Sequence, residues 1–210
     1  MKIIDISTTI SNKMTIWPRG FVPKFTKISD MEKGCLFNDT NIEMNLHVGT
    51  HVESQSHFIV DGQTINDVTI DKFIGDVYVA VLSQAVDINL NELLRLNIPK
   101  GTKRLLFKTK NSDLRRDGVT EFKRDYVGIT KDAAYWLVEH NFELIGVDYL
   151  SAAKFEEAVE VHKILLGKNI ILLEGINLTD VDSGVYYLIC LPVKILGTEA
   201  APTRAILIKS

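Results

Sequence analysis

Four side chains that can bind a metal or move a proton lie close together in one segment: His47, His51, Glu53 and His57. All four carry odd numbers. Because side chains alternate between faces in an extended chain, this spacing predicts that they project from one side of an extended segment. A helix fits less well, since Glu53 and His57 would rotate away from the face that His47 and His51 share. Gly49 suits a bulge or a close backbone approach, which would let the side chains converge.

Imidazole nitrogens and carboxylate oxygens together are the ligand set of catalytic zinc, manganese and iron(II), in sites where an open position holds water. The alternative interpretation is a solvated strand face that is rich in histidine by coincidence. A single histidine would favour that alternative. Three of the chain's five histidines around one acid favour a metal centre.

The composition is that of an ordinary globular domain: 210 residues, 46% hydrophobic and 24% charged. We expect one domain over residues 1–210. A net charge of −3 gives no reason to expect nucleic acid or a membrane as a partner. Cys35 and Cys190 are too few for a disulfide framework, and neither signal peptide nor apolar membrane span is evident, so the cytoplasm is the default location.

Hydrophobic patterning and turn residues predict an alternation of strands and helices. We expect loops at 7–23 and 111–125, helices at 90–96, 130–139 and 151–167, and strands at 2–6, 40–47, 75–82, 104–109, 142–148 and 169–174.

Two further candidate residues lie in the second half of the chain. His162 falls on the apolar stripe of the predicted helix 151–167, where a histidine is more often a hydrogen-bonded core residue than a ligand. Glu174 ends the apolar run of strand 169–174. Because unpaired carboxylates are rarely buried, we expect Glu174 at a strand end beside a cation or a metal. His140, near a helix C-terminus, is interpreted as structural.

The histidine-rich segment resembles the signature His-x-Gly-Thr-His-x-Asp-x-Pro-x-His-Phe of the cyclase-like family of metal-dependent hydrolases. That family includes bacterial kynurenine formamidases and isatin hydrolase. Similarity extends to residues 146–151, 173–178 and 191–207, and so covers most of the chain. Two residues depart from the signature: Glu53 stands in place of the aspartate and Gln55 in place of the proline.

The resemblance implies two divalent metal ions per chain, zinc as the first expectation and manganese as the alternative. By matching positions, His47, His51 and Glu53 would bind one ion, and Glu53, His162 and Glu174 the other. The extra methylene of Glu53 extends the reach of its carboxylate, so the spacing of the metals, their affinity or the choice of metal could differ from the family's.

The resemblance also implies a reaction in which metal-activated hydroxide attacks an amide or formamide carbon. His57 would be the acid–base residue; the alternative is a histidine that orients a ligand. Trp17 matches a tryptophan that contacts the aromatic substrate, although an aromatic in a loop is often only hydrophobic cover. The family follows this tryptophan with Pro-Gly-Asp, whereas here Arg19-Gly20 follows Pro18. Gln55 removes a φ constraint beside His57 and is expected to loosen it.

The fold that the resemblance implies is an α/β domain of the swivelling β/β/α type, with a twisted or barrel-like sheet and flanking helices. The first hypothesis for function is a hydrolase of a small-molecule amide, similar to kynurenine formamidase. The alternatives are a hydrolase of another cyclic or aromatic amide, such as isatin, and a metal-binding homologue without activity. Family members are commonly dimers or tetramers, so a homo-oligomer is expected.

Overall fold

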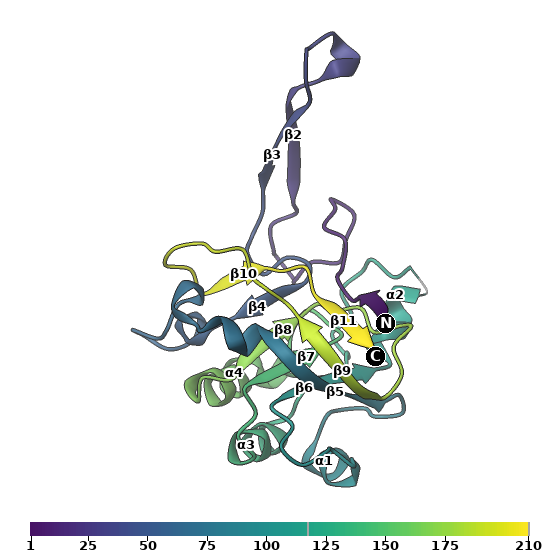
Figure 1. Cartoon of the computed structure of the whole chain (residues 1–210), viewed down its shortest axis with the longest axis vertical. Helices are drawn as coiled ribbons and strands as arrows, with labels where there is room; N and C mark the ends of the chain where they lie inside the picture. Colours follow the sequence, from purple (N-terminus) through teal and green to yellow (C-terminus); the bar gives the residue numbers. More distant parts are fainter. Residues whose placement is uncertain (117, 210) are drawn as a thin grey trace.

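The computed structural model describes residues 1–116 and 118–209. A nine-stranded, strongly curled sheet organises the molecule, with the strand order β1-β11-β9-β5-β6-β7-β8-β4-β10 (Figure 1). The strands from β5 to β8 are parallel, and the remaining pairs are antiparallel. The strands are β1 (Lys2–Asp5), β4 (His51–Glu53), β5 (Ile74–Leu82), β6 (Arg104–Thr109), β7 (Leu144–Val147), β8 (Ile171–Glu174), β9 (Gly184–Ile189), β10 (Ala200–Pro202) and β11 (Ile206–Lys209).

Helices α1, α3 and α4 lie together on one face of the sheet. The α-helices are α1 (Leu90–Arg95), α2 (Asn111–Arg116), α3 (Lys131–Glu139) and α4 (Ala158–Gly167). Short 3₁₀ helices are η1 (Met31–Lys33), η2 (Gln55–His57), η3 (Ile65–Asp67), η4 (Ile70–Phe73) and η5 (Phe155–Glu157). None of the helices in the described residues is long and apolar enough to cross a membrane.

Alternation along the central strands divides the apolar core into two clusters. Leu105 and Phe107 of β6 pack toward the helices, whereas Leu106, between them, faces the opposite side of the sheet. In β8, Leu172 faces the helices and Leu173 does not. Burial of both faces explains why these strands read as continuous apolar runs in the sequence. Glu174 lies two residues after Leu172 in the same strand, so its side chain projects from the same face, toward the helices.

The sheet and its flanking helices confirm the predicted α/β class and the curled sheet. Several local predictions were wrong. The predicted strand 40–47 ends at Glu43, because its first half pairs with another strand rather than leading into the histidine-rich segment. The predicted loop 111–125 contains helix α2, and Asp117 within it lies outside the described residues. Helix α4 begins at Ala158, not near Ser151, and the left-handed residue after it is Asn169 rather than Gly167.

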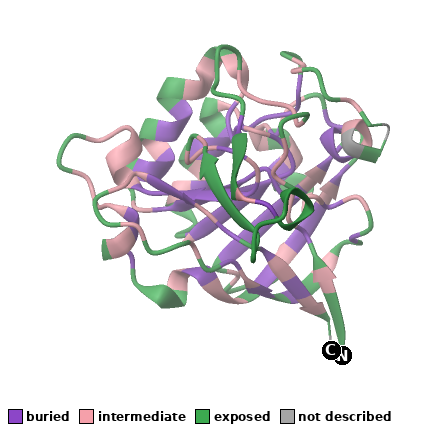
Figure 2. Ribbon diagram, turned by 90° about the horizontal axis from the view of Figure 1, so that it is seen from above, coloured by how far each residue is buried: buried purple, intermediate pink, exposed green. Residues whose placement is uncertain are grey.

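A two-stranded hairpin projects from the body of the molecule (Figure 1). We call residues 24–43 the arm; it comprises β2 (Lys24–Ser29), β3 (Asp39–Glu43) and η1 at the tip. Phe25 lies opposite Ile42 in its register. Almost every residue of the arm is exposed, in contrast to the buried central sheet (Figure 2). Among the described residues, its apolar side chains belong to neither cluster of the core.

Candidate metal centre

The pairing of β4 with β8 brings a histidine and an acid from distant parts of the chain to one point. These strands are antiparallel, with His51 directly opposite Glu174 and Glu53 opposite Leu172. Residues directly opposite each other in an antiparallel pair project from the same face. The side chains of His51, Glu53 and Glu174 therefore all face the helices. Each is almost completely buried, with 1–2% of its side chain exposed.

His47 reaches the same point through a turn rather than along a strand. The prediction that all four candidate residues lie on one extended segment was wrong, because β4 contains only His51 and Glu53 of the four. Gly49, with φ of 71°, lies in the bend between His47 and His51. Gly175, just after β8, has a positive φ as well, and a Cβ there would lie 2.2 Å from the carbonyl oxygen of Gly49. The close approach expected at Gly49 is therefore observed.

Helix α4 supplies the remaining histidine. The Nδ1 of His162 donates to the carbonyl oxygen of Ala158, one turn earlier, at 2.6 Å. This bond directs Nε2 away from the helix and toward Glu174, whose Oε1 lies 3.2 Å away. The backbone N–H of Ala152 donates to the same Oε1 at 2.6 Å. Glu174 is therefore oriented from two sides, and His162 is not an inert core residue.

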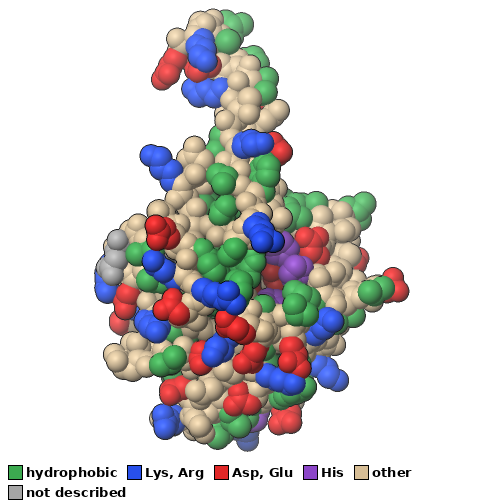
Figure 3. Space-filling view, turned by 180° about the vertical axis from the view of Figure 1, so that it is seen from behind, with side chains coloured by type: hydrophobic (Ala, Val, Ile, Leu, Met, Phe, Trp, Pro, Cys, Tyr) green, Lys and Arg blue, Asp and Glu red, His purple; other side chains and the backbone are tan. Residues whose placement is uncertain are grey.

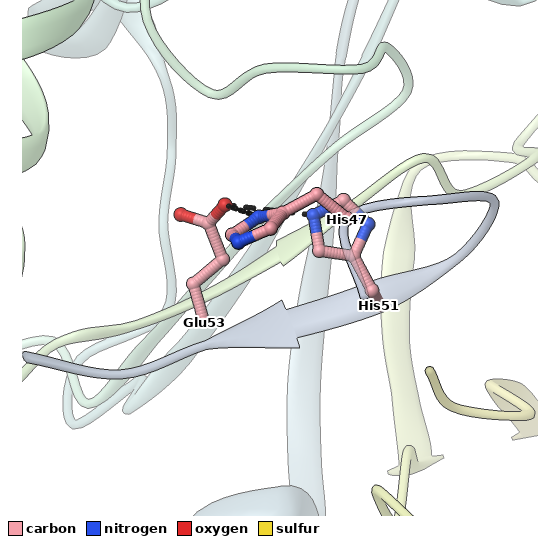
Figure 4. A group of neighbouring side chains, drawn as sticks. All are labelled: His47, His51 and Glu53. Carbon is pink, nitrogen blue, oxygen red and sulfur yellow. Dashed lines mark hydrogen bonds and ion pairs between the residues drawn. The ribbon is translucent and has the colours of Figure 1, made fainter. Parts of the chain in front are cut away.

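Figure 4 shows the side chains of His47, His51 and Glu53 turned toward one another. His47 Nδ1 lies 2.6 Å from Glu53 Oε1. The other contacts between a ring nitrogen and a carboxylate oxygen are longer. Among them are His51 Nε2 to Glu53 Oε1 at 3.5 Å, His51 Nε2 to Glu174 Oε2 at 3.5 Å, and His162 Nε2 to Glu53 Oε2 at 3.6 Å.

The charges of these groups are mutually dependent. Burial opposes a positive charge on His51, but the carboxylates of Glu174 and Glu53 outweigh it and raise the pKa of His51 to about 10. The same balance raises the pKa of His162 to about 9. Burial acts against ionisation of Glu53, yet the hydrogen bond to His47 and the nearby ring of His51 hold its pKa well below the usual range. Glu53 and Glu174 thus favour positive charge in a buried site. A divalent cation can supply that charge in place of protons on the histidines.

The donor set fits a divalent metal ion. Among the described residues, His51 Nε2 and Glu53 Oε2 are buried without any hydrogen-bond partner. Leaving such atoms unpaired costs about 1–3 kcal/mol each, and coordination would satisfy both. Two ligands about 2.1 Å from one tetrahedral ion lie about 3.4 Å apart. The 3.5 Å spacing of His51 Nε2 from Glu53 and Glu174 matches that separation.

Two overlapping groups of ligands satisfy these conditions. In each group, one donor atom per residue can be chosen so that all lie within 4.8 Å of one another. The first group is His47, His51 and Glu53, and the second is Glu53, His162 and Glu174. Glu53 belongs to both. The five predicted ligands are therefore brought together, in the same two sets that the resemblance implied; which metal they bind, and how many ions, stays a prediction.

His57 lies at the edge of this cluster on η2. Its Nε2 is 3.6 Å from Glu53 Oε1, and its ring packs against those of His47 and Phe58 at 4.3 Å each. Burial lowers the pKa of His57. The ring is therefore neutral near pH 7, with a nitrogen able to accept a proton. Gln55 begins η2, and its side-chain Oε1 accepts from the backbone of Gln63 at 3.3 Å. The looser His57 expected from Gln55 stays a prediction.

A cavity of about 400 Å³ opens above the cluster. His47, Glu53 and His162 are among the residues that line it, and Trp17, Phe21 and Phe58 supply aromatic surface. Trp17 also stacks on a neighbouring aromatic ring, that of Phe155, with centroids 5.2 Å apart. Histidine side chains are visible at the surface below the arm, bordered by hydrophobic ones (Figure 3). Trp17 thus acts as hydrophobic cover and also lines the cavity.

The structure shows two features that the sequence did not predict: the backbone conformation of Arg19 and the contact of Glu199 with His47. Arg19 occupies the position of the family's glycine after Trp17-Pro18 and adopts φ of 65°. Glu199 was not predicted as a site residue, but its Oε1 lies 3.1 Å from Nε2 of His47. These two residues are separated by 152 positions in the chain. No spacing rule could reveal that contact, because it depends on how β10 pairs with β4.

The predicted structural residue His140 lies apart from the centre. It follows the last residue of α3, stacks on Trp136 with ring centroids 3.7 Å apart, and donates from Nδ1 to the carbonyl oxygen of Trp136 at 2.8 Å. Cys190 is buried and free, with its thiol donating to the carbonyl oxygen of Phe73.

Comparison with known proteins adds an independent line of observation. The model of the family described as "Putative cyclase" matches residues 4–154. Cyclase-like protein 1 of Oryza sativa subsp. japonica is 35% identical, over 99% of this chain and 79% of that protein. Kynurenine formamidase of Salinibacter ruber is 32% identical, over 99% of this chain and 97% of that protein.

Solved structures share the fold. A structure described as a potential metal-dependent hydrolase with cyclase activity has a TM-score of 0.86 and 28% identity, covering 98% of this chain and 96% of that chain. Isatin hydrolase A from Labrenzia aggregata has a TM-score of 0.80, covering 100% of this chain and 94% of that chain. At 21% identity, the second likeness concerns the fold alone.

Proposed function

We propose that this chain, which belongs to the cyclase family, is a metal-dependent hydrolase of a carbon–nitrogen bond in a small aromatic amide or formamide. The observation that carries the proposal is that members of the histidine and glutamate cluster line the same cavity as three aromatic side chains. The family resemblance seen in the sequence is confirmed by the match over residues 4–154.

We propose two divalent ions per chain, zinc in preference to manganese. The support is the pair of overlapping ligand groups that share Glu53. Zinc binds sites that combine imidazole and carboxylate donors, and carboxylate donors also suit manganese. When bound, such ions would supply Lewis acidity toward a carbonyl oxygen and would lower the pKa of water.

The protein itself would supply proton transfer and orientation. Among the described residues that line the cavity, His57 is the only histidine outside both ligand groups. Its lowered pKa leaves its ring neutral near pH 7, so Nε2 can accept a proton from water and return it to the departing nitrogen. The 3.6 Å contact with Glu53 Oε1 directs that nitrogen toward the cluster.

The cavity lining indicates the class of substrate. The rings of Trp17, Phe21 and Phe58 offer surface for an aromatic group, and the neutral polar side chains of the lining are Thr15, Asn45 and Ser151. Among the residues that line this cavity, none is lysine or arginine. A neutral aromatic amide or formamide matches this lining better than a strongly anionic substrate does.

Elemental analysis of the purified protein, together with hydrolysis assays on N-formylkynurenine and isatin, tests the proposal. We expect bound divalent metal and turnover of the formamide, as the name of the Salinibacter relative suggests. Turnover of isatin alone would favour the cyclic-amide alternative. Bound metal without turnover of any aromatic amide would favour the metal-binding homologue and would contradict the proposed activity. A His140→Ala variant serves as a control, because His140 lies on an exposed helix end.

We also propose that the chain forms a homo-oligomer through the arm. A two-stranded hairpin is only marginally stable by itself. The arm nevertheless exposes apolar side chains at its tip, with 57% of Met31, 93% of Leu36 and 60% of Phe37 accessible. A second copy of the chain that packs on the tip would cover them. We expect no nucleic acid or membrane as a partner.

A further inference from the structure

Each ligand histidine has one ring nitrogen facing the acids and the other held by an oxygen outside both ligand groups. His51 Nδ1 faces the carbonyl oxygen of Gly49 at 3.1 Å, and His162 Nδ1 faces that of Ala158 at 2.6 Å. These oxygens can only accept hydrogen bonds, so each Nδ1 carries the proton. The opposite nitrogen, Nε2, faces the acids, and a metal ion that binds there takes the place of its proton.

His47 follows the same rule with the two nitrogens exchanged. Its Nδ1 faces Glu53 Oε1 at 2.6 Å, and its Nε2 faces Glu199 Oε1 at 3.1 Å. The oxygen that holds His47 therefore belongs to a charged side chain rather than to the backbone. His47 also stands on a turn and has 22% of its side chain exposed, whereas His51 has 1% exposed. Of the ligand histidines, it is the one least fixed by surrounding packing.

We propose that Glu199 is a positioning residue that fixes the ring and the proton of His47 for metal binding. A carboxylate that accepts from Nε2–H leaves Nδ1 as the donor atom and increases its basicity. The inference rests on the proposed metal centre, and it adds to that centre a residue outside both ligand groups.

The backbone of Glu199 is held independently of its side chain. Ser54 donates to the carbonyl oxygen of Glu199 from its backbone N at 2.9 Å and from its hydroxyl at 3.1 Å. The next residue, Ala200, pairs with Glu53 across β10 and β4. Replacing the side chain of Glu199 therefore leaves this strand pairing in place. The carboxylate can be tested without disturbing the fold.

The test compares the Zn²⁺ affinity of the wild-type protein with that of Glu199→Ala and Glu199→Gln, measured by competition with a chromophoric chelator. We expect Glu199→Ala to bind Zn²⁺ about 10–100-fold more weakly. Glu199→Gln keeps an oxygen acceptor for Nε2–H and should recover part of that loss. The matched control is Glu143→Gln, because Glu143 is exposed to a similar extent, 35% against 38%, and pairs with Lys103 far from the centre.

Two further readouts separate positioning from a loss of structure. The thermal midpoint of the metal-free Glu199→Ala protein should equal that of wild type, and the visible absorption of the Co²⁺-loaded variant should shift as the geometry at His47 relaxes. Wild-type affinity in Glu199→Ala, alongside metal binding by wild type, would overturn this inference alone. A wild-type protein that binds no Zn²⁺ would overturn the proposed metal centre and the inference with it.

Discussion

His51 lies directly opposite Glu174 across the pairing of β4 with β8, with its Nε2 3.5 Å from Glu174 Oε2. The two residues are far apart in sequence, yet one backbone register determines their distance. Shifting that register by a single residue would turn His51 and Glu53 to the opposite face of the sheet. The metal centre therefore requires the correct register between β4 and β8 as well as the correct side chains.

The first prediction concerns Glu174. Glu174→Gln keeps the size of the side chain but removes one charge from a group of three ligands. We expect Zn²⁺ affinity to fall by at least about 100-fold, more than the loss of a residue that only orients a ligand. Isothermal titration measures this directly. An unchanged affinity would show that Glu174 is not a ligand.

The second prediction concerns His57. Since it lies outside both ligand groups, His57→Ala should retain the wild-type metal content. Hydrolysis should fall by about 10²–10⁴-fold, the usual contribution of a general acid–base group. Metal analysis and turnover on the same preparation provide the comparison. Loss of the metal together with activity would mean that His57 is itself a ligand or orients one.

The third prediction follows from the raised pKa values of His51 and His162, about 10 and about 9. In the unfolded chain both titrate near 6.5. Their protonated forms therefore stabilise the metal-free protein fully below about pH 6.5, and this stabilisation is lost as the pH rises through about 9 to 10. We expect the thermal midpoint of the chelator-treated protein to fall across that range.

Metal-loaded protein is the control for this pH dependence. Bound cations replace the protons on His51 and His162, so its thermal midpoint should change less over the same range. A metal-free protein whose midpoint rises between pH 6.5 and 10 would contradict the charge balance described for the cluster.

The fourth prediction concerns the arm. Replacing Leu36 and Phe37 together by serine should weaken association about 30-fold or more, because losing apolar anchors at an interface costs about 2 kcal/mol or more. Light scattering after size exclusion measures the mass, and Val60→Ser is a control with a similarly exposed side chain, 90% against 93% for Leu36. Wild-type protein that elutes as a 23.6 kDa monomer at all concentrations would contradict the proposed oligomer.

The central strands could be predicted from sequence because the apolar composition that marks a buried strand lies within the strand itself. Buried runs such as those of β6 and β8 show a continuous apolar composition, and the acid that ends β8 indicates an unusual environment for Glu174. Thr130 and Asp132 mark the start of α3 at the expected place. The pairing of these strands was not predictable in the same way, because register is a property of two segments and not of one.

The wrong local predictions arise because contacts between distant segments determine the structure there. The segment 40–47 alternates as a strand should, but tertiary pairing with β2 assigns its first half to the arm. His47 then reaches the cluster through the turn at Gly49. Ser151 resembles an N-cap, yet residues 151–154 are not helical, and the 3₁₀ helix η5 precedes α4. Glu199 carries no local signal at all. Its contact with His47 exists only once β10 has paired with β4.

Anomalous diffraction from crystals of the Zn²⁺-loaded protein, collected at the zinc edge, tests the metal centre most directly. We predict two peaks per chain, one among His47, His51 and Glu53 and the other among Glu53, His162 and Glu174. A single peak would retain the centre but contradict the second ion. A map without any peak within about 2.5 Å of a carboxylate oxygen of Glu53 or Glu174 would contradict metal binding by this cluster.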